Sequence, residues 1–280
     1  MAEYLVSKCG VTIGLVVESE SMREIIESQL GDVVRRQETL SVETCLCVSS
    51  DSSGWILQDL KTSTTYRGAL DGDLIYQLSD RLLYHLADRN KSAHCLHAAA
   101  VSKNGKAIVM PANSGEGKSS FTAWLVANGF EYLSDEVALI NSASLVAGVP
   151  RPIQIKADGM NAIMSLVTQP SLLVKGKQTT SLRSDAITPQ IECNDDRYLA
   201  AFVFPKFLKS QPFSWRKMSS GECCLKVMSN HINARNLVGF GFSEMANIIR
   251  KTPAYELNYG GFCTLPNDFA SIIMAAIEDD

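Results

Sequence analysis

The stretch from Ala107 to Ser119 reads Ala-Ile-Val-Met-Pro-Ala-Asn-Ser-Gly-Glu-Gly-Lys-Ser. Its apolar start, Ala107–Pro111, is typical of a buried strand, and the part from Ala112 matches the pattern [AG]-x-x-x-x-G-K-[ST]. We expect a helix from Lys118 to Asn128, because Gly129 then supplies the usual helix stop. A strand, a glycine-rich turn and a helix in this order predict an α/β fold built around a buried sheet.

The glycine-rich turn has the composition of a phosphate-binding loop, or P-loop. Gly115 and Gly117 permit positive φ, so that successive backbone N–H groups can point inward toward an anion. Lys118 is expected to reach the β- and γ-phosphates of ATP, and the Ser119 hydroxyl to ligate Mg²⁺. The candidate nucleotide-binding residues are Asn113, Ser114, Gly115, Glu116, Gly117, Lys118, Ser119 and Ser120.

An acidic pair, Asp135 and Glu136, interrupts the next apolar run, Tyr132–Ile140. We expect that run to be one strand beside the P-loop strand, because it follows the P-loop helix directly. Carboxylates in a sheet are costly to bury without a compensating cation or hydrogen bonds. One acid could bind the metal while the other accepts the proton of an attacking hydroxyl. A regular strand, however, would point the two side chains to opposite faces, and a solvated strand end is the alternative.

The chain divides into two predicted parts. Residues 1–92 read as a small α/β region and residues 93–280 as the P-loop domain. In the first part we expect strands at Val11–Val17, Thr44–Ser49 and Trp55–Leu60, and helices at Ser21–Leu30 and Asp73–Asp88. Ser21 and Glu24 have the spacing of a capping box.

In the second part we expect further strands at Leu96–Val101, Leu199–Phe204 and, as an edge strand, Tyr255–Tyr259. Amphipathic stretches at Glu222–Met228 and Phe242–Ile249 predict helices. The polar stretch Thr168–Glu192 is expected to be a long surface loop.

Composition narrows the classes of function. The 280 residues are 46% hydrophobic and 20% charged, as in ordinary globular proteins, and the net charge of −4 does not favour nucleic-acid or membrane binding. We expect the eight cysteines to be free thiols. Neither a signal peptide in Met1–Gly10 nor an apolar run of the ~18 residues that span a bilayer is found, so a cytoplasmic location is predicted.

Several motifs together resemble the catalytic domain of HPr kinase/phosphorylase and, more closely, the HPr-kinase-like proteins of bacteria. They are Leu96-His-Ala-Ala-Ala, the P-loop, Gly129-Phe-Glu-Tyr-Leu-Ser-Asp-Glu and Pro150-Arg-Pro. Weaker similarity covers Phe202-Val-Phe-Pro-Lys206 and Pro253–Tyr259. The resemblance implies a P-loop-containing mixed sheet of the type shared with phosphoenolpyruvate carboxykinases, and serine kinase activity. Relatives form hexamers, so a homo-oligomer is possible.

The resemblance also implies roles for individual residues. Asp135 corresponds to the catalytic aspartate that takes the hydroxyl proton, and His97 to a histidine near the γ-phosphate. Glu136 stands where a second aspartate is usual, with a metal-linked role, and Arg151 resembles a phosphate-facing arginine. Ser120 stands where the bifunctional enzymes commonly have glutamate, and their C-terminal signature is absent, so phosphorolysis and HPr as substrate are not implied.

The leading hypothesis is therefore an ATP- and Mg²⁺-dependent kinase that phosphorylates a hydroxyl, with serine as the favoured acceptor, on a protein, a peptide or a small molecule. A nucleotide hydrolase and a non-catalytic ATP-binding partner module are the alternatives. A carboxykinase is disfavoured, because its carboxylate-binding and transition-metal residues cannot be assigned.

Overall fold

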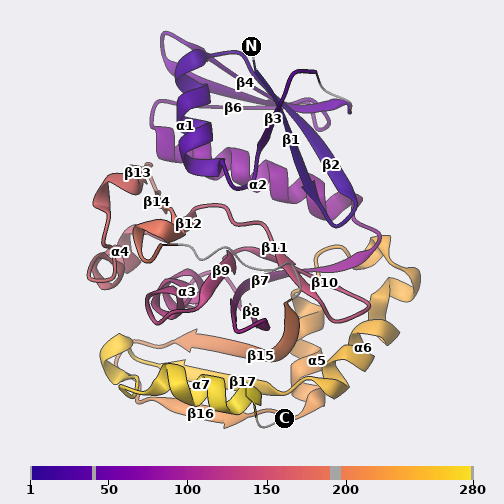
Figure 1. The fold of residues 1–280 in the computed structure, drawn as a ribbon, viewed down its shortest axis with the longest axis vertical. Coiled ribbons are helices and arrows are strands. Elements are labelled where there is room, and N and C mark those ends of the chain that lie inside the picture. Colours follow the sequence, from indigo (N-terminus) through magenta and orange to yellow (C-terminus); the bar gives the residue numbers. More distant parts are fainter. Residues whose placement is uncertain (1, 40–41, 190–196, 279–280) are drawn as a thin grey trace.

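The computed structural model describes residues 2–39, 42–189 and 197–278 (Figure 1). Within these ranges the chain forms two mixed sheets, a small antiparallel sheet and the helices that cover them, which confirms the predicted α/β class. The first mixed sheet belongs to the N-terminal region and the second carries the P-loop.

The N-terminal sheet has the strand order β3-β1-β2-β4-β5-β6. Helices α1 (Glu20–Leu30) and α2 (Asp71–Arg89) contact each other and pack against this sheet. The predicted strands and both predicted helices are present. The strands are β1 (Ala2–Lys8), β2 (Val11–Val17), β3 (Arg35–Gln37), β4 (Thr44–Asp51), β5 (Gly54–Asp59) and β6 (Thr64–Gly68).

The capping box predicted for α1 is wrong. The helix begins at Glu20 with Ser19 at the N-cap, and no side chain caps it. The Ser19 hydroxyl instead lies 3.0 Å from the Ser21 hydroxyl and accepts from Ser50 at 2.9 Å. Ser21 is thus inside the first turn, two residues after the N-cap position.

The central sheet has the order β11-β10-β7-β8-β15-β17-β16, with β9 paired to β7. The P-loop strand β8 lies between β7, which is antiparallel to it, and β15, which is parallel. The strands are β7 (Ala93–Lys103), β8 (Lys106–Pro111), β9 (Glu131–Ser134), β10 (Val137–Asn141), β11 (Val146–Gly148), β15 (Tyr198–Phe207), β16 (Ser214–Lys217) and β17 (Ala254–Tyr259).

Three predictions about this sheet are wrong. The run Tyr132–Ile140 is not one strand, because the chain bends at Asp135 and Glu136 between β9 and β10. Both of these strands pair with β7 rather than with the P-loop strand β8. Strand β17 is not at an edge, because β16 pairs with its outer side.

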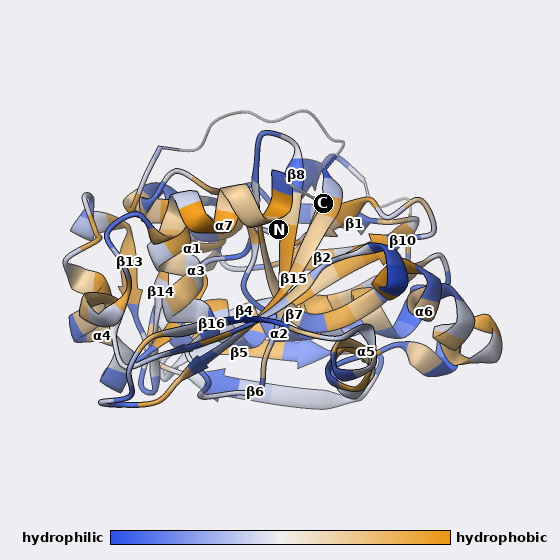
Figure 2. Cartoon of the chain, turned by 90° about the horizontal axis from the view of Figure 1, so that it is seen from below, coloured by the Kyte–Doolittle hydropathy of each residue, from blue (hydrophilic) through white to orange (hydrophobic). Residues whose placement is uncertain are grey.

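Strand β7 is apolar throughout its middle because helices cover both of its faces. Ala98 and Ala100 share a core with α5 (Ser220–Ser229) and α6 (Phe242–Lys251). Their neighbours Ala99 and Val101 share the opposite core with α3 (Lys118–Ala127) and α7 (Phe269–Glu278). Figure 2 shows the hydrophobic colour along these central strands. Burial on both faces explains why the strand lacks polar alternation.

The stretch Thr168–Glu192, predicted as a surface loop, is largely structured. It contains short 3-10 turns at Pro170–Leu172 and Ser184–Ala186 and two strands, β13 (Leu173–Lys175) and β14 (Thr179–Leu182). With β12 (Ile153–Lys156) these form the small sheet, in the order β12-β14-β13. The prediction failed because β14 is rich in Ser and Thr, yet Leu182 is buried against α4 (Ala157–Met164) and α3. Residues 190–192 of this stretch lie outside the described residues.

The N-terminal region and the P-loop domain share a core. The apolar cluster of the first sheet and α2 continues across the predicted boundary at residue 92 into Ala93 and Cys95 of β7 and Leu139 of β10. In Figure 1, α2 lies between the N-terminal sheet and the rest of the chain. The described cysteines are free thiols, and Cys193 lies outside the described residues. Over the described ranges, no helix has the length and apolar character needed to cross a bilayer.

Candidate active site

The P-loop connects β8 to α3 and has the backbone shape that its glycines predict. Gly115 has φ of 91° and Gly117 has φ of 87°, both in the left-handed region. A Cβ on Gly117 would lie 2.5 Å from the Tyr259 hydroxyl and 2.8 Å from Cβ of Phe207. Gly117 is therefore required both for backbone conformation and for close packing, and it caps the N-terminus of α3. Helix N-termini of this kind favour bound anions.

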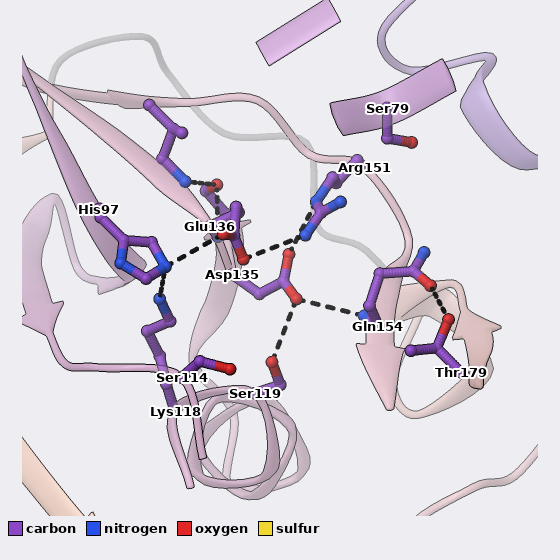
Figure 3. Close-up of polar contacts among 12 residues, drawn as sticks. Ser79, His97, Ser114, Lys118, Ser119, Asp135, Glu136, Arg151, Gln154 and Thr179 are labelled. Atoms are coloured by element: carbon purple, nitrogen blue, oxygen red, sulfur yellow. Dashed lines mark hydrogen bonds and ion pairs between the residues drawn. The ribbon is translucent and has the colours of Figure 1, made fainter. Parts of the chain in front are cut away.

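Lys118 is buried beneath the loop, with only 6% of its surface exposed. Its Nζ lies 2.7 Å from Nε2 of His97 and 3.4 Å from the carbonyl oxygen of Ala112. Burial lowers the pKa of Lys118, and the carboxylates of Glu136 and Asp135 oppose that shift. His97 and Lys118, which are far apart in the sequence, are thus in direct contact (Figure 3).

The two acids share one site because the chain bends between β9 and β10. The Ser134 hydroxyl accepts hydrogen bonds from the backbone N–H groups of Glu136, at 3.3 Å, and Val137, at 3.2 Å. This local bonding replaces strand geometry at the acidic pair. Asp135 and Glu136 can therefore both reach Arg151, which a regular strand would prevent.

Asp135 faces the P-loop but is sealed from solvent, with 1% of its side chain exposed. Its Oδ2 accepts from the Ser119 hydroxyl at 3.3 Å and from the backbone N–H of Gln154 at 3.2 Å. Its Oδ1 accepts from the Tyr132 hydroxyl and from Nε of Arg151, both at 3.2 Å. These donors compensate for the burial of the carboxylate.

Glu136 is more open, with 35% of its side chain exposed. Its Oε2 accepts from the Arg151 guanidinium at 3.2 Å, and its Oε1 lies 3.0 Å from Nε2 of His97. Burial would raise the pKa of Glu136, but the His97 contact, Arg151 and Lys118 outweigh it and lower the pKa to about 2. Nε2 of His97 donates to Glu136 in one tautomer and accepts from Lys118 in the other.

Arg151 bridges the acidic pair and is itself buried. Burial lowers the pKa of its guanidinium, and Asp135 and Glu136 more than offset this, so that the net shift is upward. Arg151 lines the cavity, but its hydrogen bonds go to the two carboxylates (Figure 3).

A cavity of about 710 Å³ brings most of the predicted site residues together. His97, Glu136 and Arg151 line it, with Asn113, Ser114, Gly115, Gly117, Lys118, Ser119 and Ser120 of the P-loop. Asp135 and Glu116 do not line it. The Glu116 carboxylate instead accepts from the backbone N–H of Asn113 at 2.6 Å, within the loop.

The cavity also has walls that the sequence analysis missed. At one end lie Phe207, Tyr259 and Phe262, and at another Tyr76 and Asp80 of α2. Gln154 and Thr179 of the small sheet complete it. Of these residues, Tyr259 alone lies in a stretch with family resemblance, Pro253–Tyr259, and that weak similarity did not mark it as a site residue. Only the i, i+4 spacing of Tyr76 and Asp80 on a predicted helix was available as a signal.

The site residues fit Mg²⁺ and a nucleotide. The P-loop offers backbone N–H groups, a buried lysine and a hydroxyl, and the cavity volume falls in the usual range for small-molecule sites, about 300–1,000 Å³. No group of three or more His, Cys, Asp or Glu side chains with metal-site geometry occurs among the described residues. Mg²⁺ does not need one, because it commonly uses one or two protein oxygens together with substrate phosphates.

No protein-family model matches this chain, and no curated protein matches it significantly. The geometry of the site is therefore the basis on which a function can be assigned.

Proposed function

We propose that this protein is an ATP- and Mg²⁺-dependent kinase that transfers the γ-phosphate to a hydroxyl, in the cytoplasm. One observation carries the proposal. A P-loop with a buried lysine faces two carboxylates that a bend in the chain turns toward it, and the loop and one of these acids, Glu136, border the same cavity. A merely structural glycine turn would not need a buried ammonium group within electrostatic reach of an acidic pair.

We also propose that the fold is of the HPr kinase type. The position of β8 supports this, because it lies inside a mixed sheet with an antiparallel neighbour on one side and a parallel neighbour on the other. The contact between His97 and Lys118 supports the family role of that histidine beside the γ-phosphate.

The two carboxylates have different proposed roles. Asp135, hydrogen-bonded to Ser119 and closed to solvent, would hold Mg²⁺ together with that hydroxyl, directly or through water. Glu136, on the cavity wall, would accept the proton of the acceptor hydroxyl. This exchanges the roles that the resemblance implies, and the reason is access, since an acceptor in the cavity can touch Glu136 but not Asp135. Mg²⁺, when bound, would neutralise negative charge on the transferred group.

The proposed transfer forms one bond to the γ-phosphorus and breaks another. The acceptor oxygen bonds to the γ-phosphorus as the bond from that phosphorus to the β,γ-bridging oxygen breaks, and ADP leaves. The hydroxyl proton passes to Glu136, whose pKa of about 2 keeps it ionised at neutral pH. A weak base suffices if the transition state is loose, because the proton is then lost late. Lys118 holds the phosphates, and the buried Arg151 keeps both acids in position.

Nucleotide hydrolysis is the second candidate. The exposure of His97 and Glu136 at the cavity wall favours it, because these groups could orient a water molecule as readily as a hydroxyl.

The fate of the γ-phosphate tests the proposal. The protein would be incubated with Mg²⁺ and γ-labelled ATP, with and without a cell extract as a source of acceptors. We expect acid-stable phosphate esters that form only with the extract and fall ~10²–10⁴-fold in Glu136→Gln, while MgATP affinity is retained. Glu256→Gln is the control, because Glu256 also accepts from cations, Arg216 and Lys226, but lies outside the cavity. Inorganic phosphate as the sole product, at equal rates with and without extract, would show a hydrolase instead.

A further inference from the structure

Helix α2 of the N-terminal region forms part of the cavity wall. Tyr76 and Asp80 lie one turn apart on this helix, so they share a face, and both border the cavity. Figure 3 shows α2, marked by Ser79, on the side of Arg151 away from the P-loop. The N-terminal region is thus opposite the phosphate-binding end of the site.

Asp80 adds an acidic side chain to the cavity wall. Its Oδ2 accepts both hydrogen bonds from Arg81, at 3.2 and 2.5 Å, and no hydrogen bond reaches Oδ1 from the residues that the structure describes. The Arg81 guanidinium lies over the rings of Tyr84, at 5.0 Å, and Tyr66, at 5.8 Å, and does not line the cavity. Arg81 thus leaves one oxygen of this cavity-lining carboxylate available to another donor.

Tyr76 adds an aromatic surface beside this carboxylate, with 37% of the residue exposed. Burial raises the pKa of the Tyr76 hydroxyl, and Asp80 and Glu136 add to the shift while Arg151 opposes it. Tyr76 therefore lies within electrostatic reach of Glu136 and Arg151.

Cations in the cavity gather at the other end. Lys118 lies under the P-loop, and Nζ of Lys156 donates to the Ser114 hydroxyl at 3.0 Å. Lys209 borders the cavity with the aromatic group of Phe207, Tyr259 and Phe262, and the charge of Arg151 is opposed by the two carboxylates that it contacts. Asp158 is a further acid on the wall. With phosphates held at the lysine end, the α2 end retains negative charge.

We propose that Tyr76 and Asp80 form the subsite for the phosphate acceptor, and that this acceptor carries an ammonium or guanidinium group next to its hydroxyl. The inference rests on the proposed kinase function. A carboxylate and an aromatic face together bind such cations, while the hydroxyl is directed toward Glu136. Two sources share this chemistry: a free amino alcohol, and a serine peptide with a neighbouring basic residue.

Four probes test the subsite. They are two serine peptides that differ only in a flanking Arg or Glu, together with ethanolamine and its uncharged analogue ethylene glycol. With MgATP, we expect phosphorylation of a cationic probe with kcat/KM at least about tenfold above its partner, as one ion pair in a partly desolvated site allows. A preference for the Arg peptide over the Glu peptide would indicate a serine peptide as acceptor. A preference for ethanolamine over ethylene glycol would indicate a free amino alcohol.

Asp80→Asn should lower kcat/KM for the cationic probe about tenfold and leave MgATP affinity unchanged. Asp88→Asn is the matched control: it is the same change on the same helix, in an Asp–Arg pair with Arg235 that lies outside the cavity. Tyr76→Phe should retain the preference and Tyr76→Leu should weaken it. Thermal unfolding of each variant verifies that it folds.

Equal rates for cationic and uncharged or acidic probes, or equal effects of Asp80→Asn and Asp88→Asn, would overturn the subsite. So would MgATP binding with transfer to none of the four probes. Loss of MgATP binding in the unmodified protein would instead remove the proposed function on which the subsite depends.

Discussion

Asp135 and Glu136 are adjacent in the sequence, yet their carboxylates have different surroundings. Asp135 is enclosed by four donors and Glu136 borders the cavity. The sequence predicted that an acidic pair would face the P-loop. It could not predict which acid would be accessible, because this depends on Ser134, whose hydroxyl sets the bend.

At the same scale, Asp135→Asn should destabilise the fold. The substitution removes the charge that compensates the buried Arg151, and it turns an amide donor toward groups that themselves donate. Breaking a buried ion pair costs about 3–5 kcal/mol, so we expect a loss in this range in urea unfolding. Asp88→Asn breaks an exposed Asp–Arg pair and should cost at most about 1 kcal/mol. Equal losses in the two variants would contradict the structural role of Asp135.

His231 should make stability depend on pH. Its Nε2 lies 3.3 Å from Nδ1 of His94, and burial, then His94, lower its pKa from 6.5 to about 4. The unfolded chain binds the proton more readily, so stability should be complete above pH 6.5 and decline as the pH falls toward 4. Urea unfolding at several pH values should show a smaller decline in His231→Gln. The same pH slope in both proteins would refute the assignment.

At the scale of elements, long apolar runs gave correct predictions and pairing did not. Ala107–Pro111 and Val11–Val17 are strands because hydrophobic burial decides them locally. The position of β9 and β10 beside β7, however, is set by contacts between distant parts of the chain. The same holds for β14, whose Ser and Thr residues resemble a loop until β12 and β13 pair with it.

The P-loop gives a prediction at this scale. Gly115→Ala should cost about 1 kcal/mol, because φ is positive but a Cβ would meet no atom within 4 Å. Gly117→Ala should cost more, about 2 kcal/mol or above, since its Cβ would also displace Tyr259 or Phe207. Urea unfolding of both variants measures the difference. Equal costs would mean that Tyr259 and Phe207 can move aside without lowering the free energy of unfolding.

At the scale of the whole molecule, the N-terminal region completes both the core and the cavity. The predicted boundary at residue 92 marks a change of sheet, but the apolar cluster crosses it. Tyr76 and Asp80 come from before that boundary and line the cavity with the P-loop. The motif therefore indicated the phosphate-binding end of the site. The opposite wall comes from helix α2, which precedes the P-loop in the sequence. It carries no comparable sequence signal.

A shared core predicts cooperative unfolding of the two parts. Trp55 lies in the N-terminal sheet, and Trp124 and Trp215 lie in the P-loop domain. Variants that retain only Trp55, or only Trp124, should report the same urea midpoint, because loss of either part exposes the common cluster. Two separated midpoints would show that the parts unfold independently.

The central claim is that the P-loop and its buried lysine bind MgATP. Calorimetric titration of the protein with MgATP tests it most directly. We expect saturable binding by the unmodified protein that weakens at least about tenfold in Lys118→Ala, since the variant loses a charge-assisted contact to phosphate. Lys209→Ala, which removes an exposed lysine from the same end of the cavity, should retain more of the affinity. Unchanged affinity in a folded Lys118→Ala variant, or no binding by the unmodified protein, would contradict the account.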